Sequence, residues 1–157
     1  MTTMQPLSRP GLRGFAQDVR YGAVLIAAAA RPGSHIPGRA RSLLYSLLTA
    51  LLGLVALVPV GITLLVVVRG LLYGFVDRGP YDDSWGGPSL AGAWLTHVAV
   101  GVPLVAAAAL MLWLLARLHR RVVAHLDGTR PSWWVVPVTV LVGGVGLFVV
   151  VAWTRQI

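Results

Sequence analysis

The sequence predicts an all-α integral membrane protein with three transmembrane helices. Three long stretches, residues 42–68, 84–116 and 132–154, contain no formally charged residue. Each is long enough to cross the ~30 Å hydrocarbon core of a bilayer, which takes about 20 helical residues. The chain is also 57% hydrophobic, with a mean hydropathy of +0.77. That composition is typical of membrane proteins.

The N-terminal arm, residues 1–42, is expected to stay outside the bilayer core on the cytoplasmic side. Within it, residues 15–30 are predicted to form a short helix, whose apolar run at 21–30 is too short to span. Because Arg13 and Arg20 precede that run, we expect an interfacial helix lying on the membrane. The sequence leaves open the alternative that this run belongs to a larger membrane segment.

The three-helix transmembrane domain, residues 43–157, begins with a span predicted at about 43–68. Pro59 lies inside this span and predicts a kink, because proline interrupts the helical hydrogen bonds. The second span is predicted at about 89–116. Pro88 precedes it and suits the first position of a helix, where a missing N–H leaves no bond unmade.

The second helix is expected to continue out of the bilayer through residues 117–127. Gly128 then provides a good C-terminal stop. The third span is predicted at about 133–153, and Trp133 and Trp134 at its start are expected at the headgroup level. Small residues within this span allow a neighbouring helix to approach closely: Gly143, Gly144 and Gly146.

Loop charges predict the orientation. Residues 1–42 carry six Arg and one Asp, and residues 117–132 carry four Arg and one Asp, whereas residues 69–89 carry two Arg and three Asp. Basic loops stay in the cytoplasm. We therefore expect a multi-pass protein of the bacterial plasma membrane, with a cytoplasmic N-terminus and an extracytoplasmic C-terminus.

Composition excludes several classes of function. Cysteine, lysine and glutamate are absent, and the sequence contains no nucleophile elbow, zinc-protease motif or P-loop, so we expect no enzyme. The net charge of +8 would suggest nucleic acid for a soluble protein. Here basic loops facing the cytoplasm explain it, and the expected partner is the lipid bilayer rather than nucleic acid.

His97 is the ionisable residue that lies deepest in a predicted span, about two to three turns inside. Ionisable residues at such depth mark functional sites by default, here for proton sensing or for a bond to another helix. The alternative is a neutral ring bonded to Thr96 or to a backbone carbonyl. We expect no cofactor: a haem needs two axial ligands, and no second His lies within a span, although a symmetric dimer would supply one.

The loop predicted on the outer side contains three carboxylates beside Tyr81 and Trp85, those of Asp77, Asp82 and Asp83. Carboxylate oxygens bind hard cations. However, their spacing is irregular, and Asp near Gly and Pro usually forms turns, so we expect turns and no metal.

Three arginines fall at helical spacing just after the second span: Arg117, Arg120 and Arg121. With His125 they form a basic face that attracts anionic headgroups, at ~1 kcal/mol per basic residue. Such a face retains this end in the cytoplasm, and it also suits an acidic partner.

The run Ser84-Trp85-Gly86-Gly87-Pro88, followed by Trp94 and His97, resembles the membrane sensor domains found as input regions of actinobacterial histidine kinases and as stand-alone homologues. The resemblance covers residues 65–128. It implies a sensing surface formed by Trp85, Trp94 and His97, and it implies no particular ligand.

These observations favour a small membrane sensor. It would detect an extracytoplasmic or bilayer condition at residues 81–97 and relay it through residues 117–126 to another membrane or signalling protein, or within a homo-oligomer. The alternative is a structural or accessory subunit of a larger membrane complex, such as a transporter or respiratory assembly. The candidate sensing and partner residues are Asp82, Asp83, Trp85, Trp94, His97, Arg117, Arg120 and Arg121.

Overall fold

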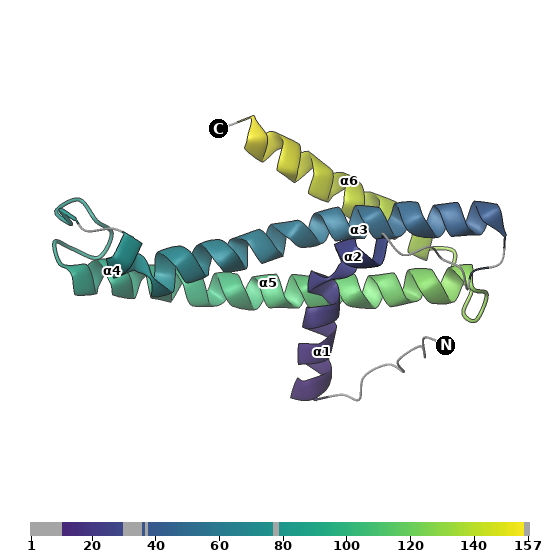
Figure 1. The fold of residues 1–157 in the computed structure, drawn as a ribbon, viewed down its shortest axis with the longest axis horizontal. Helices are drawn as coiled ribbons and strands as arrows, with labels where there is room; N and C mark the ends of the chain where they lie inside the picture. The colour runs from purple at the N-terminus through teal and green to yellow at the C-terminus, as the bar shows by residue number, and fades with distance from the viewer. Residues whose placement is uncertain (1–10, 30–35, 37, 77–78, 156–157) are drawn as a thin grey trace. The chain divides into compact units, whose positions relative to one another are not determined.

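The computed structural model is all-helical, which confirms the predicted fold class (Figure 1). It describes residues 11–29, 36, 38–76 and 79–155. Three helices within these residues are long and apolar enough to cross a membrane. Less than a third of the most apolar window of each is buried inside the protein. Because large apolar side chains are so widely exposed, the solvent that surrounds them is lipid.

The three long helices occupy the predicted stretches. Along the chain, the elements are α1 (Leu12–Ala23), α2 (Leu25–Ala29), α3 (Arg39–Val66), the π-helical turn η1 (Val67–Leu71), α4 (Tyr73–Val76), α5 (Leu90–Leu126) and α6 (Val135–Thr154). The short N-terminal helix is therefore confirmed, but it begins at Leu12 and is interrupted at Val24, between α1 and α2. The first span starts at Arg39, before the predicted residue 43, because helical hydrogen bonding extends beyond the apolar stretch at its N-terminal end.

Local chemistry sets both ends of α5. The Ser89 hydroxyl accepts the backbone N–H of Gly92 at 3.2 Å, which makes Ser89 the N-cap. Pro88 therefore stands before the cap, and not at the first helical position as predicted. At the other end, α5 stops at Leu126, and Gly128 has a φ of +83°. This left-handed conformation confirms the predicted C-terminal stop.

The chain divides into two compact units. Unit 1 comprises residues 1–58 and 111–157, and unit 2 comprises residues 59–110. Each unit therefore contains one part of α3 and one part of α5. The boundary in α3 falls at Pro59, which lies inside a continuous helix. The kink expected there stays a prediction.

The core of unit 1 is formed by α3, α5 and α6. Tyr45 and Leu48 of α3 pack with Val122 and Leu126 of α5 and with Val135 of α6, and all five are buried. The residues from α3 are three positions apart and those from α5 are four apart, so one stripe of each of these two helices faces this core. The rest of each surface is left to the bilayer.

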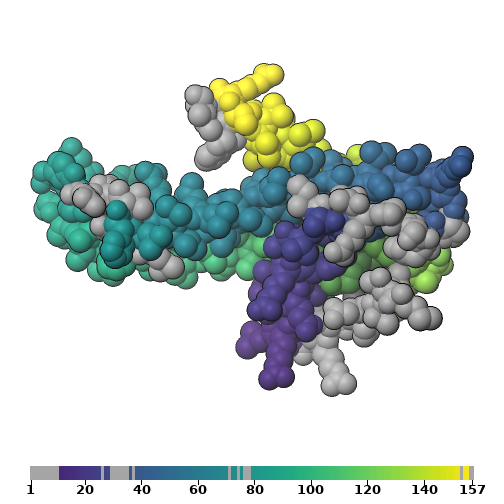
Figure 2. All heavy atoms as spheres, viewed as in Figure 1, coloured from purple at the N-terminus to yellow at the C-terminus, as the bar shows by residue number. Residues whose placement is uncertain are grey.

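Glycines bring α6 close to α3 in unit 1. A Cβ atom at Gly143 would overlap the Leu51 side chain, and one at Gly146 would overlap the Val55 side chain. A Cβ atom at Gly144 would meet nothing. The predicted close approach is thus confirmed for the two glycines three positions apart. Figure 2 shows atoms of α6 (yellow) at the surface in this view, as expected for a helix with one packed side.

Candidate functional site

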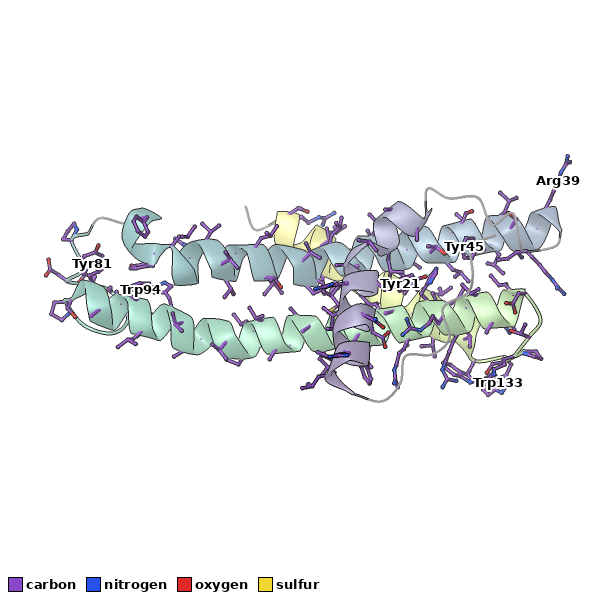
Figure 3. All side chains as sticks on the ribbon, turned by 60° about the horizontal axis from the view of Figure 1, so that its bottom comes forward. Tyr21, Arg39, Tyr45, Tyr81, Trp94 and Trp133 are labelled. Atoms are coloured by element: carbon purple, nitrogen blue, oxygen red, sulfur yellow. The ribbon has the colours of Figure 1, made fainter. Side chains whose placement is uncertain are left out.

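Two clusters of polar and aromatic side chains are candidate sites, one in each unit. The polar node of unit 1 consists of Asp18, Tyr21, Thr49, His119 and Arg120. The aromatic cluster of unit 2 consists of Tyr73, Tyr81, Trp94 and His97. Figure 3 labels Tyr21 in the node and Tyr81 and Trp94 in the cluster.

An ion pair ties α1 to α5. Nη2 of Arg120 lies 2.8 Å from Oδ1 of Asp18. The Asp18 side chain is only 4% exposed, whereas that of Arg120 is 24% exposed. Nη2 and Nε of Arg120 make no well-aligned hydrogen bond within the described chain. The contact therefore acts mainly through charge, and it contributes to compensating a buried carboxylate.

His119 joins three helices at the centre of the node. Its Nδ1 lies 2.8 Å from the Tyr21 hydroxyl of α1, and its Nε2 lies 3.1 Å from the Thr49 hydroxyl of α3. The ring is 1% exposed, and the Tyr45 ring packs 5.9 Å away. A hydroxyl either donates or accepts, so the two partners satisfy a neutral ring in either tautomer. The His119 ring can therefore be buried with both of its nitrogens hydrogen-bonded.

The last turns of α1 approach the backbone of α5. A Cβ atom at Gly22 would overlap the carbonyl group of Leu112. Near the start of α1, the Phe15 ring lies 6.1 Å from the Trp113 ring. Gly22 is buried, as are Gly14 and Asp18 at the same helical spacing. One face of α1 is therefore packed within unit 1, and other side chains of the helix, including that of Gln17, are exposed.

The predicted basic face separates into residues with different roles. Arg120 is the partner of Asp18, as described above. Arg117 lies with its guanidinium carbon 4.1 Å from the centre of the Trp113 ring. The same atom of Arg121 lies 5.3 Å from the centre of the Trp134 ring. His125 accepts the backbone N–H of Ser132 through Nδ1 at 2.9 Å, and so fixes the turn between α5 and α6.

In unit 2, Trp94 connects α5 to η1. Its indole N–H donates a short hydrogen bond to the carbonyl oxygen of Gly70. A π-helical turn such as η1 breaks the regular i→i−4 ladder, and such turns are frequent at functional sites. The indole thus provides a side-chain donor where the helical bonding is irregular.

His97 follows one of the two predicted alternatives. Its Nδ1 lies 2.8 Å from the carbonyl oxygen of Ala93, one turn earlier in α5, so Nδ1 carries the proton and donates. The ring also stacks on Tyr73, with 4.2 Å between centroids and an interplanar angle of 26°. Tyr73 is buried and lies 6.3 Å from the Tyr81 ring. The cluster therefore holds His97 by a backbone bond and by stacking.

The outer-loop residues form turns. Asp82 and Asp83 are exposed, and the Ser84 N–H bonds to the Tyr81 carbonyl at 3.0 Å. Trp85 is 80% exposed. Asp77 lies outside the described residues, and within those described no three His, Cys, Asp or Glu side chains are grouped to hold a metal ion.

Sequence reasoning missed Asp18 and His119. Both had a usable signal in helical spacing. Asp18 lies four residues from both Gly14 and Gly22, a row of small residues that marks a packing face. His119 lies seven residues after the buried Leu112, on the stripe that α5 packs inward.

Comparison of the chain with protein-family models, curated proteins and solved structures finds no match. The class of protein is therefore defined by its fold alone. The protein is a small multi-span helical membrane protein, with three helices that span by length and hydropathy.

Proposed function

We propose that the protein is a small membrane sensor that relays an extracytoplasmic or bilayer condition to a partner protein through α1. The carrying observation is the buried contact between Asp18 of α1 and Arg120 of α5. Burying two charges costs desolvation that their attraction barely repays, so a buried ion pair is weak evidence for a purely stabilising role. A short helix whose contacts include an ion pair and a histidine can exist docked or released, and a signal needs two such states.

The aromatic cluster is the proposed input. It combines the one titratable side chain predicted deep in a span, His97, with a π-helical turn whose Gly70 carbonyl is bonded by Trp94. The sequence resemblance to sensor domains supports this role for Trp85, Trp94 and His97. The helix α5 carries residues of both the cluster and the polar node, and is the proposed route between input and output.

The proposed output surface is the exposed face of α1. Arg120 and His119 are occupied within unit 1, so residues 117–126 offer a partner less surface than the sequence suggests. The exposed side chains of α1 include Arg13, Gln17 and Arg20. In Figure 2, α1 (purple) lies at the surface of the view.

The proposed orientation follows from the loop charges. The N-terminus and the turn between α5 and α6 face the cytoplasm, and the C-terminus lies outside the plasma membrane of a bacterium. The contacts of α1 with the last turns of α5 support one shared side for both segments. A reporter that is active only in the cytoplasm, fused after Ile157, should be inactive, and activity would reverse the orientation.

Photo-crosslinking in intact membranes tests the relay. A photoreactive residue at Gln17 should capture a cytoplasmic regulator or kinase, and His97→Ala should change the yield. The matched control is Leu57 on α3, which is also exposed but apolar. Capture of a large membrane subunit at Leu57, with nothing at Gln17, would contradict the sensor role.

Capture of a large membrane subunit at Leu57 would instead support the role of an accessory subunit. One observation favours this alternative: a half-open apolar groove of about 290 Å³ in unit 2. Val66 and Val67 line one side, and Val98, Gly101 and Val102 line the other. Small and β-branched residues of this kind pack against helices of larger subunits.

A further inference from the structure

We infer that Arg117 and Arg121, each seated over a tryptophan ring, bind the phosphate groups of anionic phospholipids. The inference concerns the basic end of α5 in unit 1 and is independent of the sensor role. It assigns to these two arginines a ligand class, and it separates them from Arg120.

Arg117 is held in place by its own helix. Its guanidinium carbon lies 4.1 Å from the centre of the Trp113 ring, one turn earlier, and the Phe15 ring of α1 lies 6.1 Å from the same Trp113 ring. A guanidinium stacked on an aromatic face keeps its N–H groups at its edge, where they can donate in pairs to a phosphate. Stacking thus pre-orders the donor without using it.

Arg121 is held from a different element. Its guanidinium carbon lies 5.3 Å from the centre of the Trp134 ring, just before α6. Trp134 packs against the core of unit 1, which restrains this second stack. Arg117 and Arg121 are four residues apart in one helix, so they are neighbours on its surface. Two guanidinium groups that can donate hydrogen bonds to phosphate therefore lie side by side.

The charges of these arginines are not compensated within the described chain. The ion pair found there joins Arg120 to Asp18. Arg117 and Arg121 are exposed, and their described contacts are with aromatic rings. An anion that approaches this surface therefore meets two cations that no ion pair of the described residues neutralises.

The expected position of Arg117 and Arg121 at the bilayer surface favours a lipid ligand over a soluble acidic partner. Arg117 is the first charged residue after the uncharged stretch 84–116, so it lies where the hydrocarbon ends. Tryptophan rings also rest at headgroup level. Basic surfaces at this level bind anionic headgroups, and charge and depth together indicate the phosphate of an anionic phospholipid.

Native mass spectrometry of the full chain in detergent tests this. The purified protein is titrated with phosphatidylglycerol and with phosphatidylcholine. We expect preferential retention of phosphatidylglycerol, weakened about five-fold by Arg117→Gln or Arg121→Gln and about thirty-fold by both. Arg→Lys at both positions should retain part of the binding, because charge remains but paired donation is lost.

Arg39→Gln with Arg41→Gln is the matched control, since it removes two exposed charges from α3 (Figure 3 labels Arg39). The inference requires this control to bind like the wild type. If both double variants lose phosphatidylglycerol binding equally, net charge alone explains the effect and the site is overturned. Equal retention of phosphatidylglycerol and phosphatidylcholine by the wild type would also overturn it. Full displacement by millimolar inorganic phosphate would identify free phosphate as the ligand and overturn the lipid assignment.

Discussion

The two units hold their polar side chains in different ways. In unit 1, the side chains of the polar node contact side chains of other helices: Asp18 contacts Arg120, and His119 contacts Tyr21 and Thr49. In unit 2, the described side chains bond mainly to backbone oxygens. Those of Thr63, Thr96 and His97 bond to carbonyls of the preceding turn, and Trp94 reaches the carbonyl of Gly70.

This difference predicts where the molecule is sensitive to substitution. A backbone carbonyl inside a helix already accepts a helical hydrogen bond, so it loses little when a side-chain donor is removed. A buried carboxylate or imidazole that loses its partner keeps its full desolvation cost. We therefore expect unit 1 to respond strongly to single polar substitutions and unit 2 weakly.

The largest effect is expected at Arg120. Arg120→Met removes the guanidinium 2.8 Å from the buried Asp18 carboxylate, and should lower the free energy of unfolding by about 3 kcal/mol. That value is at the low end for buried pairs, because the Arg120 side chain keeps 24% exposure. Unfolding in mixed micelles measures it.

Asp18→Asn provides the comparison for Arg120→Met. It should cost less, because the guanidinium that remains still reaches solvent or headgroups. Adding Asp18→Asn to Arg120→Met should restore part of the loss. Purely additive effects of the two substitutions would show that the pair is not coupled.

The next largest effect is expected at Gly22. Gly22→Ala places a methyl group against the carbonyl of Leu112, and the backbone cannot yield as a side chain would. We expect a loss of about 2 kcal/mol in stability, within the range for overpacking. Gly144→Ala is the control, because its added Cβ meets open space. Equal thermal stability of the two variants would argue against a close approach of α1 to α5.

A smaller effect is expected at Thr49. Thr49→Val keeps the shape but removes the hydroxyl that contacts His119, and should cost about 1 kcal/mol. Thr139 is equally buried, but its hydroxyl donates to the Val135 carbonyl of its own helix. Thr139→Val should therefore change the unfolding midpoint much less. A matching loss in both would remove the distinction between the two kinds of bond.

The smallest effect is expected at His97 in unit 2. His97→Phe keeps the ring that stacks on Tyr73 and loses a bond to a carbonyl that already accepts one. Stability should change by less than about 0.5 kcal/mol, on the scale of weak bonds between membrane helices. A loss comparable to that of Arg120→Met would refute the contrast between the units.

Much of the fold was predictable because it depends on local signals. Apolar length predicts the three spans, and Gly128 predicts the end of α5. The glycines in α6 predicted a close approach of another helix. Only the structure shows that Gly143 faces α3 and that Gly144 does not. The start of α5 was predicted less well, because Pro88 was expected at the first helical position and Ser89 is the N-cap.

The candidate site was harder to predict because it depends on distant pairing. Asp18 and Arg120 are separated by most of the chain, and nothing local indicates that the one acid of the N-terminal arm meets the second of three nearby arginines. His119 lies in residues 117–127, the extension that the sequence predicts outside the bilayer. Its burial follows only once α1 and α3 are packed against α5.

Docking of α1 on α5 is the central claim, and the absence of native cysteine allows a direct test. Phe15→Cys with Trp113→Cys, treated with a short bismaleimide in native membranes, should gain the mass of one bridging reagent. The control pair Phe15→Cys with Leu114→Cys is turned by about 100° around α5 and should take two separate reagents. Bridging of the first pair alone is the predicted result. Two separate adducts in the first pair, or equal bridging in both, would contradict the account.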